Sequence, residues 1–199
     1  VEMLLDLSSG LMGDSTRSAF LFGDADPSAT DELLERLSTQ RLKADPGAYS
    51  VYCNDGFTLA ELVVEAVSGQ SFTDFVREEL LTPAGLTDTY TPADEFDTDR
   101  LARIYLGDDT RALPADTLNI IGAGGIYATA SDLASFGGAL CGPGLLEQDS
   151  LDDMAADHAV DGIWPADSED DILAYGLGWD SVHMYPFNQN GIQALVKGG

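Results

Sequence analysis

Basic residues are scarce in this sequence, which has 9 Lys and Arg against 35 Asp and Glu among its 199 residues. The formal net charge is −26, and Lys43 and Lys197 are the only lysines. A surface of this sign repels nucleic-acid backbones and anionic membranes, so we expect no nucleic-acid partner. The acid-rich, lysine-poor composition suits high salt or general solubility, and by itself it indicates no substrate.

Cysteine and histidine are also scarce, with Cys53, Cys141, His158 and His183 as the only examples. One disulfide is arithmetically possible, but nothing else in the sequence supports it. Without a Cys-x-x-Cys pair or grouped histidines, we expect no metal site and no cofactor. No apolar run reaches the ~18 residues of a membrane-spanning helix, and the first residues lack the features of a secretory signal.

The apolar pattern predicts one α+β domain segment over residues 1–199 that is mainly helical. Helices are expected over 30–37, 58–68, 71–81, 131–140 and 149–157, with Ser71 and Ser131 at two of the starts. Short strands are expected near 125–129, 175–183 and 192–197. The segments 13–29 and 83–118 are rich in turn residues, and we expect loops there.

One short pattern carries chemistry, Tyr52-Cys53-Asn54, between a Pro46-Gly47 turn and the helix expected from Thr58. A tyrosine and an asparagine two residues apart in such a turn can both project into one cleft. Taken alone, the pattern equally describes a packed tyrosine and an asparagine in a local turn. Cys53 is better explained as a small buried residue than as a nucleophile.

The segments around this pattern favour a functional interpretation of Tyr52 and Asn54. The chain resembles the class C β-lactamase and D-Ala-D-Ala peptidase (penicillin-binding protein-like) family of serine hydrolases in six segments that keep the family's order and approximate spacing: Leu4–Leu11, Pro46–Gly56, Phe57–Phe72, Leu81–Thr89, Gly124–Leu133 and Tyr175–Trp179. This resemblance implies the mainly helical subdomain of the β-lactamase/transpeptidase-like fold. It also implies a small-molecule or peptide substrate, and a longer protein working outside the cytoplasm.

The resemblance further implies roles for five residues. Tyr52 would be the acid/base, because a phenol with an ordinary pKa near ~10 acts as a base at neutral pH only beside cations. Lys197 would supply such a cation, and Asn54, Gly198 and Gly199 would bind substrate. Lys197-Gly198-Gly199 resembles the family's Lys-Thr-Gly motif with glycine in place of threonine. This change removes a hydroxyl donor from the place where a substrate carboxylate would sit.

The family's nucleophile, the serine of a Ser-x-x-Lys motif, is missing, because no serine in the chain has a lysine three residues later. We therefore expect a central piece of a longer hydrolase, without its N- and C-terminal sheet portions and inactive by itself. The parent would hydrolyse an amide, ester or β-lactam carbonyl through an acyl-enzyme. Two alternatives stay open: a non-catalytic binding module that keeps the hydrolase-like cleft, and a protein whose acid-rich surface is its function.

Overall fold

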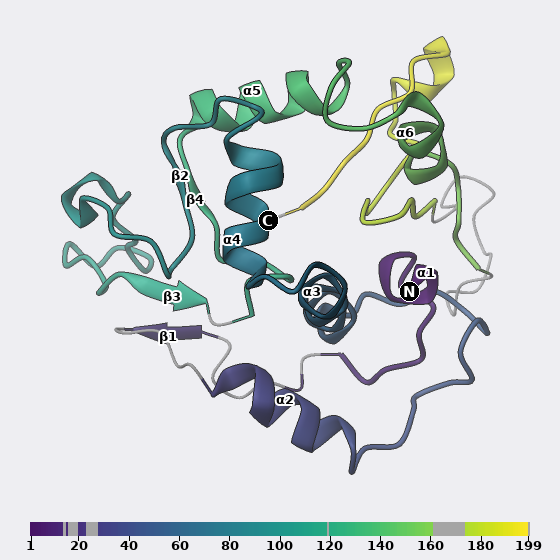
Figure 1. Cartoon of the computed structure of the whole chain (residues 1–199), viewed down its shortest axis with the longest axis horizontal. Helices are drawn as coiled ribbons and strands as arrows, with labels where there is room; N and C mark the ends of the chain where they lie inside the picture. Colours follow the sequence, from purple (N-terminus) through teal and green to yellow (C-terminus); the bar gives the residue numbers. More distant parts are fainter. Residues whose placement is uncertain (14, 16–19, 23–27, 119, 161–173, 199) are drawn as a thin grey trace.

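The computed structural model describes residues 1–13, 15, 20–22, 28–118, 120–160 and 174–198. Its helices are α1 (Glu2–Leu5), α2 (Ala29–Leu37), α3 (Asn54–Ser68), α4 (Phe72–Val76), α5 (Ala130–Leu140) and α6 (Gln148–Met154). A π-helical turn, Arg77–Leu81, continues α4, and Thr98–Arg100 and Asn188–Asn190 are short 3-10 segments. In Figure 1, α3 lies near the centre, with α1 beside it and α4 rising from its end toward α5.

The strands form two small antiparallel sheets. In one, β1 (Phe20–Phe22) pairs with β3 (Asp116–Leu118), and in the other β2 (Thr89–Tyr90) pairs with β4 (Tyr127–Ala128). Of these strands, β4 lies within the expected 125–129 strand, whereas β1, β2 and β3 fall in segments expected to be loops. A three-residue strand is too short to show the alternation by which a sequence pattern reveals strands.

The strands expected near 175–183 and 192–197 are not formed as strands among the described residues, which corrects the expectation. In the described residues 174–198, the strand pairing between these two segments is limited to one isolated antiparallel bridge, Ser181 with Val196. The chain between them contains the 3-10 segment Asn188–Asn190, so the two sides do not continue as a paired ladder. Apolar alternation had favoured strands, but a strand also needs a partner at every step.

Helix starts follow local capping chemistry, with two differences from expectation. The helix expected from Thr58 starts at Asn54, so Asn54 belongs to the first turn of α3. The helix expected from Ser131 starts at Ala130 and is capped by Thr129, whose Oγ1 accepts from the Asp132 N–H at 3.1 Å. Both threonine and serine suit this position, and the backbone selects the residue with extended geometry.

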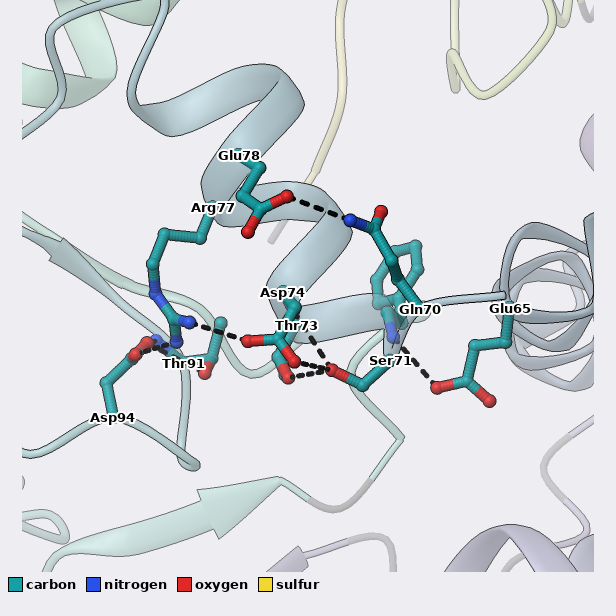
Figure 2. A network of polar contacts seen from close by, with 10 residues as sticks. Glu65, Gln70, Ser71, Thr73, Asp74, Arg77, Glu78, Thr91 and Asp94 are labelled. Carbon is teal, nitrogen blue, oxygen red and sulfur yellow. Dashed lines mark hydrogen bonds and ion pairs between the residues drawn. The ribbon is translucent and has the colours of Figure 1, made fainter. Parts of the chain in front are cut away.

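The junction between α3 and α4 is held by the polar network in Figure 2. Ser71 caps α4 as expected, accepting from the Asp74 N–H at 3.1 Å. Arg77 then joins Asp74, at 2.8 Å, to Asp94 beyond β2, which also accepts from the Thr91 N–H at 2.7 Å. Burial would raise the pKa of Asp94, but these hydrogen bonds and the Arg77 charge outweigh it and lower the pKa. The carboxylate therefore stays ionised into acid and ties Arg77, directly after α4, to the segment that follows β2.

Candidate active site

The turn Leu7–Gly10 supports the segment that carries Tyr52. Leu7 and Gly10 both have left-handed backbones, with φ of 66° and 75°. A carbonyl oxygen, that of Ala44, would lie 2.3 Å from any Cβ at position 10, so glycine is required there. Three backbone hydrogen bonds of 2.8–2.9 Å join the turn to residues 43–51, which lead to Tyr52. They run from Lys43 N–H to Gly10 C=O, from Gly47 N–H to Ser8 C=O and from Val51 N–H to Leu7 C=O.

Tyr52 follows the segment that this turn supports and is exposed to solvent. This residue is 47 % exposed, whereas the next residue, Cys53, is buried and has the extended backbone of the residue before α3. Burial raises the pKa of the Cys53 thiol, although a hydrogen bond with the Gly56 backbone opposes the shift. The thiol is therefore held neutral, which agrees with its interpretation as a packing residue. Asn54 follows as the first residue of α3 and is half-buried.

Lys197 reaches this place from the far end of the chain. Its Nζ lies 5.1 Å from the ring centroid of Tyr52 and 5.1 Å from that of Phe57, in the first turn of α3. Both distances are within the ~6 Å range of a cation–π contact. The structure thus brings together the two residues that the sequence analysis placed in one site, and it adds Phe57 as a second aromatic wall.

Asp180 is the residue that sequence reasoning missed. Its Oδ1 lies 2.7 Å from Lys197 Nζ, and its Oδ2 accepts from the Gly198 N–H at 2.8 Å. The bridge between Ser181 and Val196 explains the meeting, because the next pair outward in that antiparallel register is Asp180 with Lys197. The only sequence signal was an acidic residue directly after Trp179, and it becomes meaningful once the register is known.

The predicted site residues therefore have different outcomes. Tyr52, Lys197 and Gly198 are joined through the Lys197 contact with the ring and the shared carboxylate of Asp180. Asn54 lies two residues after Tyr52 in the first turn of α3. Gly199 lies outside the described residues.

Glu61, one turn after Phe57 in α3, binds the glycine-rich bend that precedes β4. Its Oε2 accepts from the Gly122 N–H at 2.7 Å, although the residue is only 8 % exposed. A Cβ at position 122 would lie 2.6 Å from the Phe57 carbonyl oxygen, so only glycine lets the bend approach α3. Burial raises the pKa of Glu61, the Gly122 N–H opposes this, and the charge of Glu65 adds to it.

This raised pKa predicts a pH-dependent difference between the wild type and Glu61→Gln. The folded protein holds the Glu61 proton more tightly than the unfolded chain, so this side chain favours folding at low pH. That contribution is lost as the pH rises through the folded-state pKa. We expect Glu61→Gln to be the more stable protein at pH 7–8, with an advantage that shrinks toward the unfolded glutamate pKa near ~4.3. Urea unfolding over this pH range measures the difference.

The exposed Glu35 on α2 provides the matched control, because Glu35→Gln makes the same chemical change without burial. Its stability difference from the wild type should vary much less with pH. If the Glu61→Gln difference were constant from pH 4 to pH 8, the buried carboxylate would not be the titrating group.

A cavity of about 550 Å³ lies elsewhere, between β2, β4 and the segment from Asp97 to Ile104. It is lined by Tyr90, Phe96 and Tyr127 and includes none of the five predicted site residues. Across the described ranges there is no group of three or more His, Cys, Asp or Glu residues arranged to hold a metal ion. None of the described helices is both long and apolar enough to cross a bilayer.

Comparison with known proteins identifies relatives along most of the chain. A family model described as Beta-lactamase matches residues 1–186, a range that includes Tyr52 and ends before Lys197. The D-alanyl-D-alanine-carboxypeptidase/endopeptidase AmpH of Escherichia coli (strain K12) is 35 % identical over 98 residues, 49 % of this chain and 24 % of the relative. A D-aminopeptidase of Brucella anthropi is 30 % identical over 130 residues, 64 % of this chain and 24 % of the relative. The chain thus spans about a quarter of the length of these two relatives.

Solved structures show the same fold. A D-stereospecific amidohydrolase from Streptomyces sp. superposes with a TM-score of 0.69 and 25 % identity, covering 89 % of this chain and 55 % of that one. The architecture around α3 is therefore that of the β-lactamase/transpeptidase-like fold, as the sequence analysis expected.

Proposed function

This chain belongs to the beta-lactamase family, and from that premise we propose that it forms part of the active site of a serine hydrolase. In this proposal the enzyme attacks an amide, ester or β-lactam carbonyl and passes through an acyl-enzyme. Tyr52 takes and returns the proton of the attacking serine, and the Lys197 ammonium, which is paired with Asp180, lies against the Tyr52 ring. Asn54 and the backbone of Gly198 and Gly199 line the place where substrate binds.

The observation that carries the proposal is the contact between Lys197 and the ring of Tyr52. A serine hydroxyl is a weak nucleophile until a base removes its proton, and this contact places side by side the two residues to which the family resemblance assigns that work. The family match ends before Lys197, so the role of this lysine rests on its position against Tyr52 and not on the match.

The nucleophile is proposed to lie outside these 199 residues. No Ser-x-x-Lys occurs in the sequence, and the chain covers about a quarter of the length of the curated relatives described above. The hydrolytic activity is accordingly proposed for the protein that contains both parts, and the isolated chain is proposed to have none. Loss of the nucleophile alone removes several orders of magnitude in rate.

The substrate is proposed to be a small molecule or a peptide with an amide bond. The names of the relatives include a D-alanyl-D-alanine carboxypeptidase, a D-aminopeptidase and a D-stereospecific amidohydrolase. Each of these names includes the D configuration, and two of them name a peptidase.

The test compares this chain with a longer polypeptide from the same gene that includes a Ser-x-x-Lys. A p-nitrophenyl ester is supplied as the substrate, and intact-mass spectrometry looks for an acyl adduct on the serine. We expect turnover and an adduct for the longer protein and neither for the 199-residue chain. Serine-dependent turnover by the isolated chain would contradict the proposal, and a gene without such a serine would favour a non-catalytic binding module.

A further inference from the structure

Asp180 already occupies the two donors that the Lys197–Gly198 motif presents. One carboxylate oxygen is 2.7 Å from the Lys197 ammonium and the other accepts from the Gly198 N–H at 2.8 Å. An ammonium and an adjacent backbone N–H are together a good binding place for a carboxylate, because charge-assisted hydrogen bonds are the stronger ones. In this protein that carboxylate belongs to the chain itself.

The glycine at position 198 fits the same arrangement. A Cβ there would lie 3.3 Å from Asp180 Oδ2, which is closer than most real Cβ contacts. A threonine, as in the Lys-Thr-Gly motif, would therefore press against the oxygen that the Gly198 N–H binds. Glycine at position 198 therefore leaves room for the Asp180 carboxylate beside its own N–H.

The ion pair is also difficult for a dissolved anion to displace. Asp180 and Lys197 are opposite each other in the Ser181–Val196 register, and the Asp180 N–H donates to the Val196 carbonyl at 2.8 Å. Exposed ion pairs contribute little on their own, and these side chains are 27 % and 34 % exposed. The backbone, however, holds the carboxylate permanently at its partners, which gives it a large effective concentration. The net charge of −26 further lowers the local concentration of anions.

We propose that Asp180 acts as an internal carboxylate that blocks the anion-binding end of the site and determines specificity. The substrate class is then amides and esters that carry no free carboxylate beside the scissile bond. Substrates with a free C-terminal carboxylate are rejected, because their anionic group meets an occupied pair of donors and the Asp180 charge. This inference rests on the proposed function, because it assumes that the site acts on a substrate. Whether Asp180 occupies the two donors, however, can be tested by binding experiments alone.

The test uses two ligands that differ only at the group in question, N-acetyl-D-alanine and N-acetyl-D-alaninamide. Each is titrated into the 199-residue chain, and the Gly198 amide resonance is followed by ¹H–¹⁵N NMR. The wild type should bind the amide more tightly than the carboxylate. Asp180→Asn keeps the shape of the side chain but not its charge, and it should gain about tenfold in affinity for the carboxylate, the equivalent of one charge-assisted interaction. Its affinity for the amide should stay within about twofold, because no charge meets that ligand.

The control is Asp99→Asn in the exposed 3-10 segment Thr98–Arg100, which changes the net charge equally and should leave both affinities unchanged. The proposal is overturned if the wild type binds the carboxylate as tightly as the amide or binds neither. It is equally overturned if Asp180→Asn gains no affinity for the carboxylate. The wild-type comparison is decisive even if the variant is unstable. Because binding needs no nucleophile, an inactive longer protein would refute the proposed function and leave this result standing.

Discussion

Replacing Tyr52 with phenylalanine is expected to lower the turnover of the complete hydrolase by about 10²–10⁴-fold, the usual contribution of a general acid/base. The change removes only the hydroxyl, so the ring still meets the Lys197 ammonium and the contact at 5.1 Å is kept. The residue is 47 % exposed, so the stability should change little. Steady-state kinetics with a p-nitrophenyl ester and a thermal unfolding curve measure the two effects.

Tyr49→Phe is the matched control. Tyr49 belongs to the same segment, but its hydroxyl is directed to the Lys43 carbonyl at 3.4 Å and has no part in the proposed site. Its removal should leave turnover close to that of the wild type. If Tyr52→Phe kept more than half of the wild-type activity, the proton-transfer role would have to pass to another group.

Replacing Gly10 with alanine is expected to destabilise the protein by about 2–5 kcal/mol. The left-handed backbone at φ 75° costs about 1–2 kcal/mol for a residue with a Cβ. The new methyl group would also meet the Ala44 carbonyl oxygen at 2.3 Å, and relieving such overpacking costs about 1–3 kcal/mol. Because the turn is hydrogen-bonded to the segment that leads to Tyr52, activity of the complete protein should fall as well. Urea denaturation measures the loss of stability.

Gly69→Ala separates the two costs. Gly69 ends α3 with φ 73°, almost the same backbone as Gly10, but nothing lies within 4 Å of its potential Cβ. This variant should therefore show only the backbone cost of about 1–2 kcal/mol. Equal destabilisation by the two variants would show that Ala44 moves aside freely, and that the turn does not hold the Tyr52 segment tightly.

The helices near the site were largely predictable because their signals are local. Apolar spacing identified α3 and Gly69 marks its end, and Ser71 with Asp74 marks the start of α4. The true start of α3 was hidden by Asp55, which is buried although polar. Its carboxylate accepts from the Ser15 N–H at 2.8 Å and from the Ser15 hydroxyl at 2.5 Å. A partner so distant in sequence makes a charged residue acceptable inside, and no periodicity reveals it.

The sequence alone was enough to identify the family resemblance, to choose Tyr52 and Lys197, and to show that the nucleophile is missing, because motifs are read residue by residue. The position of Asp180 in the site, in contrast, was visible only in the folded structure. Its meeting with Lys197 and Gly198 depends on the register at Ser181 and Val196, and shifting that register by one residue would turn the carboxylate to the other face. Pairing between distant segments is set by the packing of the whole molecule, so a residue whose role depends on its cross-strand partner becomes visible only in three dimensions.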